Sequence, residues 1–317
     1  MLKQKERNKS SMNKYLPEGF ILSSSENREY ITSIQGLEKA FQSGRILEGM
    51  AIMCDEDLNI TVDLYGITGI IPKSEAMYSS KEQKDIAIIT RIGKPVCFKV
   101  IGFKDDCGKR TAILSRRAAQ EECYRNFIST LIPGDVIDAK VTHMERFGAF
   151  VDIGCGIISL MTIDSISVSR IAHPKDRFTV GMSIKAVVKS IEKESGRVYV
   201  SQKELLGTWL ENADQFKIGQ TVAGTVRSIE DYGVFIELAP NLTGLAEARD
   251  DLCIGQSAAV YIKNIIPERM KIKLVIIDVG KKETHTSLPK YYIEGKEHID
   301  RWVYSPQCCN KVTESIF

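Results

Sequence analysis

The sequence has little excess charge of either sign. Its 317 residues carry 43 Lys and Arg against 41 Asp and Glu, which leaves a formal net charge of +2. A domain that attracts nucleic acid by bulk charge is strongly basic, so charge alone does not indicate such a partner. With 43% hydrophobic and 26% charged residues, the composition is that of a globular chain of two or three domains. This composition excludes a disordered or collagen-like chain.

The sequence also lacks a long hydrophobic run. The longest apolar stretches, such as residues 272–278, are too short to span a bilayer. The charged N-terminus, MLKQKERNKS, is not followed by an apolar stretch, so we expect no secretory signal. The sequence therefore predicts a cytoplasmic protein with no membrane partner.

Motifs for metal binding, cofactor binding and catalysis are missing from the sequence. The eight cysteines form no CxxC pair, which favours reduced thiols. Adjacent Cys308 and Cys309 leave a redox or metal-binding pair as the alternative, but on a weak signal. There is no GxxxxGK[ST] phosphate loop, and the four histidines have no HExxH spacing. We expect no metal, no cofactor and no enzymatic activity.

What the sequence does contain is an internal repeat. The stretch GDVIDAKVTHMERFGAFVDIG from Gly134 aligns with GQTVAGTVRSIEDYGVFIELA from Gly219, 85 residues later. The second halves of these two copies begin at Gly181 and Gly255. A more divergent copy lies upstream, where LNIT (58–61) stands in the place of FGAF. The chain is therefore expected to hold three related units.

Each copy is typical of a small β-barrel. Its strands are short, rich in β-branched residues and bounded by glycine or charged turns. About five strands in about seventy residues fit an oligonucleotide-binding (OB) barrel better than a sandwich. We predict an all-β fold of three tandem five-stranded OB barrels, joined by short helical linkers and preceded by a short helical lead. The expected boundaries are 1–43 for a basic tail and helix, 44–118 for a degenerate barrel, 131–204 for the middle barrel, 216–278 for a shortened barrel and 279–317 for an unassigned tail.

Helices are expected before and between the barrels. Residues 28–44 read as one helix that ends at Gly44, and residues 1–14 as a disordered basic segment. Residues 115–130 and 201–216 have helical apolar spacing, with Trp209 as a packing residue at the second junction. For the tail after residue 279, one option is that it packs on the last barrel.

Two aromatic residues surround a glycine in both the middle and the last copy. Strand alternation points Phe150 and Asp152 out of the barrel, and a bulge or twist at Gly148 would bring Phe147 to the same side. The same pattern brings Tyr232 to Phe235. Exposed rings suit nucleobases, which stack on them with about 1–3 kcal/mol per base. Core or inter-domain packing is the alternative, but recurrence of the pattern favours a shared binding function.

Basic residues near the rings are expected to hold phosphates. The candidates in the middle copy are Lys140, Arg146, Lys189 and Arg197. In the last copy they are Arg227, Lys263, Arg269 and Lys271. His143 is expected on the first strand facing solvent, with a phosphate contact as the alternative.

The middle and last copies resemble the RNA-binding domain of ribosomal protein S1. The features that carry the resemblance are Gly134, FGAFVD (147–152), GMSIKAVV (181–188) and VSQK (200–203). With the more divergent first copy included, the resemblance covers about residues 44–278, and it implies a five-stranded OB barrel that binds single-stranded RNA. It places the stacking rings on Phe147 and Phe150, and on Tyr232 and Phe235, the basic residue before the last strand on Arg197, and its acidic partner on Glu192.

The sequence departs from the family pattern at two places. The family often has a histidine after the third strand, where this chain has Thr162 and Glu247. The first copy has no stacking pair, although GIIPKSE (69–75) is similar to the first, non-RNA-binding units of the family. We therefore expect the first barrel to be a docking or spacer unit.

The leading hypothesis is a non-catalytic protein that binds single-stranded RNA, such as mRNA, in translation or RNA handling. The small ribosomal subunit or RNA-processing proteins are the further partners that this hypothesis implies. The alternative is a protein-docking adaptor that tethers a ribosome or a nuclease, with RNA contact incidental. An enzyme would need its chemistry in the two unassigned ends, which are too short for a catalytic domain.

Overall fold

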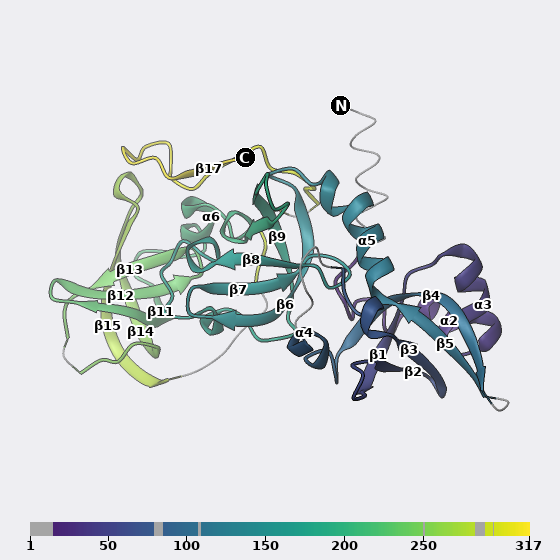
Figure 1. Cartoon of the computed structure of the whole chain (residues 1–317). Helices are drawn as coiled ribbons and strands as arrows, with labels where there is room; N and C mark the ends of the chain where they lie inside the picture. Colours follow the sequence, from purple (N-terminus) through teal and green to yellow (C-terminus); the bar gives the residue numbers. More distant parts are fainter. Residues whose placement is uncertain (1–14, 79–84, 107–108, 250, 283–288, 294) are drawn as a thin grey trace. The chain divides into compact units, whose positions relative to one another are not determined.

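The computed structural model describes residues 15–78, 85–106, 109–249, 251–282, 289–293 and 295–317. It contains three closed five-stranded barrels and one two-stranded sheet (Figure 1). The prediction of an all-β chain of three tandem OB barrels is confirmed. The chain divides into two compact units: unit 1 is Met1–Leu131, Asp138–Lys140 and Asp152–Ile158, and unit 2 is Ile132–Ile137, Val141–Val151 and Ser159–Phe317. The basic segment 1–14, which the sequence predicts to be disordered, lies outside the described residues.

The first barrel forms from five strands in unit 1. They are β1 (Leu47–Cys54), β2 (Ile60–Leu64), β3 (Ile67–Ile71), β4 (Pro95–Asp106) and β5 (Lys109–Ser115), in the order β1-β2-β3-β5-β4. The short helix η1 (Lys73–Glu75) and α4 (Asp85–Ile89) connect β3 to β4. Ile60, Val62 and Leu64 alternate along β2 and are fully buried, so one face of the strand fills the barrel.

The N-terminal lead contains two helices where the sequence predicts one. They are α2 (Ser25–Ile31) and α3 (Ile34–Ser43). Ser33 breaks the helix because its hydroxyl accepts a hydrogen bond from the Gly36 N–H at 3.0 Å and so caps α3. Gly36 also lies against α2, since a Cβ there would be 2.4 Å from the Tyr30 carbonyl oxygen. The predicted end at Gly44 is confirmed, and this residue has a φ of 62°.

The middle barrel has the same strand order as the first. Helix α5 (Arg116–Asn126) and η2 (Ile128–Thr130) precede it, where a helical linker is predicted. Its strands are β6 (Val136–Glu145), β7 (Gly148–Asp152), β8 (Ile158–Thr162), β9 (Ser183–Ile191) and β10 (Val198–Ser201). A long connection with η3 (Ile163–Ser165) and η4 (Pro174–Asp176) separates β8 from β9.

The last barrel keeps all five strands although its copy is shorter. They are β11 (Thr221–Glu230), β12 (Gly233–Ala239), β13 (Leu242–Ala246), β14 (Gln256–Ile266) and β15 (Lys271–Lys282), with η6 (Pro267–Arg269) between the last two. This copy is shorter than the middle one because its connection after β13 spans only residues 247–255. The linker before it holds η5 (Lys203–Leu205) and α6 (Trp209–Ala213), and Trp209 is 2% exposed in the core of this barrel, the packing role that the sequence predicts.

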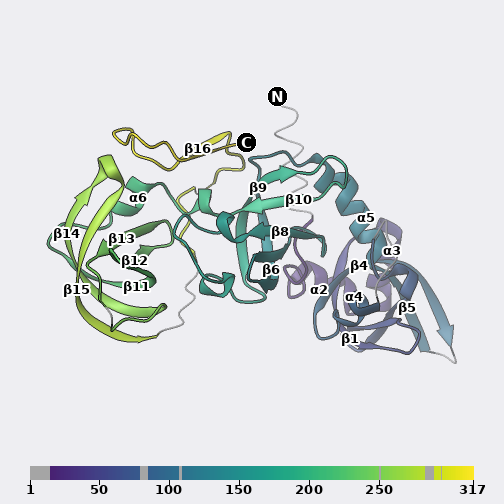
Figure 2. The same cartoon turned by 60° about the vertical axis from the view of Figure 1, so that its left-hand side comes forward.

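The C-terminal tail packs within unit 2. It forms the hairpin β16 (Arg301–Val303) and β17 (Glu314–Ile316), and Figure 2 shows it in yellow on the same side of this unit as α6. Trp302 and Tyr304 join the core of the last barrel, and the Tyr304 hydroxyl donates to the Asn241 carbonyl at 2.6 Å. Residues 297–299 pair with the chain that enters β6: the Val136 N–H donates to Glu297 and the Ile299 N–H to Gly134, both at 2.9 Å.

Among the described residues, no helix is long and apolar enough to cross a membrane.

Candidate nucleic-acid interface

Each aromatic pair is presented by a two-residue β-hairpin. In the last barrel, the pairing of β11 with β12 runs up to Glu230 opposite Gly233, so Asp231 and Tyr232 form the turn. Arg146 and Phe147 occupy the same place between β6 and β7. The turn, and not the predicted bulge at the glycine, therefore brings the first ring of each pair outside the barrel.

The two ring pairs have nearly the same geometry. Phe147 and Phe150 have centroids 5.9 Å apart with planes at 88°, and Tyr232 and Phe235 have 6.0 Å and 87°. The turn residues are open to solvent, with Phe147 55% and Tyr232 70% exposed, while both strand residues are half-buried. A flat ligand can therefore reach both rings of each pair from solvent.

The glycine of each pair is required by a neighbouring strand. A Cβ on Gly148 would lie 2.4 Å from the Met161 carbonyl oxygen of β8. A Cβ on Gly233 would lie 2.5 Å from the Ala246 carbonyl oxygen of β13. Any side chain would push the hairpin away from the next strand, so glycine fixes the close approach that holds the turn in place.

His143 joins the rings of the middle barrel. Its imidazole is stacked on Phe150, with centroids 6.0 Å apart and planes at 26°. Its side chain is exposed, as the sequence predicts, but its contact with Phe150 was not anticipated. The signal was available, because the repeat aligns His143 with Ser228, which lies opposite Phe235 in the β11–β12 pairing.

The positions of the family histidine lie beside the hairpins. A Cβ on Gly148 would lie 3.0 Å from the Cα of Thr162, and the Ile163 N–H donates to the Phe147 carbonyl at 2.9 Å. The Thr162 hydroxyl is bonded to that of Ser165 at 2.9 Å. Glu247 is exposed at the corresponding place after β13. The middle barrel thus has a neutral residue beside its rings, where the last barrel has an acid.

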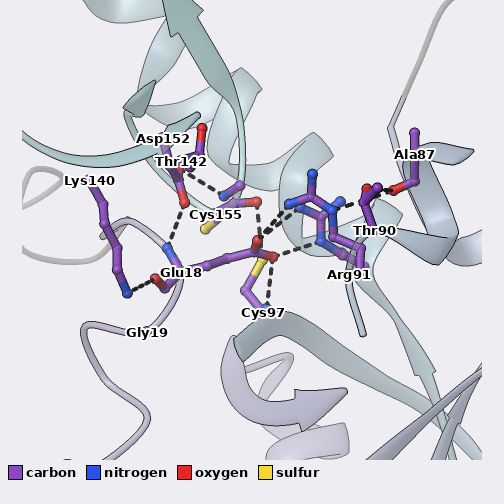
Figure 3. Close-up of polar contacts among 12 residues, drawn as sticks. Glu18, Gly19, Ala87, Thr90, Arg91, Cys97, Lys140, Thr142, Asp152 and Cys155 are labelled. Carbon is purple, nitrogen blue, oxygen red and sulfur yellow. Dashed lines mark hydrogen bonds and ion pairs between the residues drawn. The ribbon is translucent and has the colours of Figure 1, made fainter. Parts of the chain in front are cut away.

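The predicted outward direction of Asp152 does not take it into solvent. Its side chain is buried, and its carboxylate accepts hydrogen bonds from the N–H groups of Glu18 at 2.7 Å, Gly154 at 2.9 Å and Gly156 at 3.0 Å (Figure 3). Burial, together with the charge of Glu18, raises the pKa of Asp152 to about 7. Asp152 is therefore shielded from solvent, because the N-terminal segment covers it.

Glu18 belongs to a buried ion pair. Its carboxylate accepts from Arg116 Nε at 2.6 Å and Nη2 at 3.0 Å, and from the Cys97 N–H at 3.1 Å (Figure 3). Arg91 lies 3.7 Å from the same carboxylate. Burial alone would raise the pKa of Glu18, but the charge and hydrogen bonds of Arg116 outweigh it and hold that pKa below its usual value.

Three predicted cations are already bound by the protein. Arg227 is 12% exposed and pairs with Glu237 at 2.8 Å, so it is not free for phosphate, and its prediction is wrong. Lys140 Nζ donates to the Glu18 carbonyl at 2.9 Å. Lys189 Nζ donates to the Ser165 hydroxyl at 2.8 Å and lies 3.5 Å from Asp164. Lys189 stays exposed, so it can exchange these partners for phosphate more easily than Lys140.

The other predicted cations are exposed. None of them forms an ion pair with another residue in the described part of the chain: Arg146, Arg197, Lys263, Arg269 and Lys271. Arg146 lies in the hairpin turn directly before Phe147. One exposed cation was missed: Lys273 on β15 lies opposite Leu245, which lies opposite Phe235. A cation therefore stands in the same row of the sheet as that ring.

No group of three or more His, Cys, Asp or Glu side chains among the described residues could hold a metal ion.

Comparison with known proteins identifies the domain family of the middle barrel. Residues 130–203, which contain all five strands of the middle barrel, match the S1 RNA binding domain. This match covers the middle barrel alone, and the other two barrels share its strand order. The relatives of the chain are ribosomal proteins. It is 29% identical to the small ribosomal subunit protein bS1 homolog of Bacillus subtilis, over 89% of this chain and 72% of that one.

Two further relatives carry the name small ribosomal subunit protein bS1. The protein of Leuconostoc lactis is 30% identical over 76% of this chain and 56% of its own length. That of Rhodopseudomonas palustris is 31% identical over 80% of this chain and 44% of its own length. This chain thus spans about half the length of these two relatives.

Proposed function

We propose that this chain is a non-catalytic, cytoplasmic protein that binds single-stranded RNA and acts in translation, on mRNA and at the small ribosomal subunit. The observation that carries this proposal is the exposed aromatic pair found at the same hairpin of two consecutive barrels. Exposed rings without a partner are costly in water, and unpaired bases are flat partners of matching size. The relatives named as ribosomal proteins support the same setting.

Each residue class has a distinct role in this proposal. Phe147 and Phe150 stack bases on the middle barrel, and Tyr232 and Phe235 on the last. Arg146, Arg197, Lys263 and Arg269 hold phosphates, while Lys140 and Lys189 contribute only after releasing their present partners. Two tethered barrels then bind one strand with avidity, because binding at one raises the effective RNA concentration at the other. The first barrel, which has no such pair, acts as a docking or spacer unit.

The test removes one strand ring from each barrel. Binding of a labelled, unstructured RNA of about 20 nucleotides, long enough for two OB barrels, is measured by fluorescence anisotropy. Phe150→Ala and Phe235→Ala should each weaken binding by about 5- to 150-fold, since a stacked base contributes about 1–3 kcal/mol. The double variant should lose far more than either single change, because neither barrel then keeps an intact ring pair to hold the strand for the other.

A control exists in unit 1. Phe41 of α3 and Phe103 of β4 form another edge-on pair, with centroids 6.3 Å apart and planes at 84°, and Phe41 is 47% exposed. Phe41→Ala should leave RNA binding unchanged. Unaltered binding by the folded Phe150→Ala, Phe235→Ala variant would contradict the proposal.

Salt dependence separates this function from the adaptor alternative. RNA affinity should fall with salt concentration at a logarithmic slope near −0.7 for each phosphate neutralised. A protein that binds ribosomes stably but shows neither RNA binding nor this slope would be an adaptor.

A further inference from the structure

His143 makes the ring surface of the middle barrel larger than that of the last barrel. One face of its imidazole lies against Phe150, at 6.0 Å and 26°, while Phe147 meets Phe150 edge-on at 5.9 Å. The His143 side chain is 62% exposed, so the ring is not a core residue. Three rings from β6, the turn and β7 therefore share one surface open to solvent.

Glu145 holds the imidazole in position. The His143 Nε2 lies 2.7 Å from the Glu145 Oε1, two residues further along β6. A ring that is already oriented loses less conformational entropy when a ligand stacks on it. The contact thus favours binding without occupying either face of the imidazole.

The last barrel has no ring at this place. The repeat aligns His143 with Ser228, and Ser228 lies opposite Phe235 in the pairing of β11 with β12. The two barrels therefore present the same hairpin, glycine and aromatic pair, and differ at this register position by one side chain.

We infer that His143 is a third base-stacking residue, and that it makes the middle barrel the stronger RNA site of the two. This inference rests on the proposed function. An unpaired base that stacks on the open face of the imidazole adds a contact to those that bases make with the other two rings. Since every base has a π-face, the additional contact is tolerant of sequence. If His143 only faced solvent and contacted no ligand, its replacement by serine would not change RNA binding.

The experiment uses the full chain with one barrel silenced. In a Tyr232→Ala, Phe235→Ala background, the RNA site that remains is the middle barrel. There, His143→Ser should weaken binding of the labelled RNA by about 5-fold or more, while His143→Phe should restore it, because either aromatic ring offers a stacking face. In a Phe147→Ala, Phe150→Ala background, Ser228→His should strengthen binding by the last barrel.

A second readout distinguishes stacking from a structural role. Oligonucleotides that carry 2-aminopurine report stacking directly, and His143→Ser should remove part of the fluorescence quenching that His143→Phe recovers. Circular dichroism checks that each variant is folded.

The outcomes separate this inference from the function on which it rests. If the Phe150→Ala, Phe235→Ala variant loses RNA binding but His143→Ser does not, His143 is a bystander and the proposed function stands. If His143→Ser weakens binding and His143→Phe fails to restore it, the effect is not stacking and the inference is wrong. If the Phe150→Ala, Phe235→Ala variant binds RNA normally, the proposed function falls as well.

Discussion

Asp152 and Glu237 occupy the same place in two copies of one strand, yet their surroundings differ. Both are acids two residues after the strand ring, and both are buried. Asp152 accepts backbone N–H groups, one of which comes from Glu18. Glu237 instead pairs with two guanidinium groups, Arg177 at 2.6 Å and Arg227 at 2.8 Å.

The comparison shows what the acid of this strand does in both barrels. In each barrel the acid binds a segment from elsewhere in the chain. Asp152 accepts a hydrogen bond from the N–H of Glu18, and Glu237 pairs with Arg177 in the connection between β8 and β9. In unit 2, this ion pair therefore fastens the connection between β8 and β9 to β12. The acid serves the packing of the chain, while the neighbouring ring remains free for a ligand.

The largest loss of stability is expected when Arg116, the cation that pairs with Glu18, is removed. Arg116→Ala leaves the buried Glu18 with Arg91, 3.7 Å away, in place of a cation at 2.6 Å. This should lower the stability of unit 1 by about 3–5 kcal/mol. Hydrogen exchange of unit 1 amides measures this loss. Arg117→Ala is the control: its side chain is 45% exposed and pairs with Glu75, so the expected change is within about 0.5 kcal/mol. Equal effects of the two variants would contradict the buried ion pair.

A smaller effect is expected when each acid is replaced by its amide. Glu237→Gln leaves the buried Arg177 without its ion-pair partner and Arg227 with only Asp176, 3.6 Å away, and should cost about 2–4 kcal/mol. Asp152→Asn keeps one acceptor for the backbone N–H groups and should cost only about 1 kcal/mol. The fluorescence of Trp209 and Trp302, the only two tryptophans of the chain, follows the first change because both lie in unit 2. A larger loss of stability for Asp152→Asn than for Glu237→Gln would contradict the view that Glu237 depends on its charge and Asp152 on its hydrogen bonds.

The smallest effect is a pH dependence confined to unit 1. Burial raises the pKa of Asp152 and of Glu48 to about 7, from ordinary values near 3.8 and 4.5. A raised folded-state pKa means that the folded chain binds the proton more tightly, so stability is lost as the pH rises toward and through 7. Between pH 6 and 8, unit 1 should lose about 1 kcal/mol for each group. Asp152→Asn combined with Glu48→Gln should flatten this slope in hydrogen exchange, and an unchanged slope would show that other groups produce it.

The sequence predicted those features that depend on neighbours in the chain. The internal repeat, with its short β-branched strands bounded by glycine or charged turns, was enough to predict three barrels. The break between α2 and α3 was also local, since Ser33 is a good helix cap, but the apolar periodicity across residues 28–44 concealed it. The end of that segment at Gly44 was correctly predicted, because a glycine there adopts the left-handed conformation without strain.

Features that depend on distant residues could not be predicted from the sequence. Asp152 is buried by Glu18, 134 residues away, and Glu237 by Arg177, 60 residues away. Arg227 was predicted to bind phosphate because nothing in its own strand shows that Glu237 and Asp176 hold it. The stacking of His143 on Phe150 was missed for the opposite reason: it needed only the hairpin register, but the turn had been taken for a bulge.

The pairing of residues 297–299 with the start of β6 has a consequence for how the protein is made. Val136 donates its N–H to Glu297, so this edge of the middle barrel stays in water until residue 297 has been synthesised. The last strand of this barrel, β10, ends at Ser201. At about 5–20 residues per second, the remaining stretch takes the ribosome roughly 5–20 s. During that time, the start of β6 in the nascent middle barrel has no strand partner on this side, until residues 297–299 pair with it.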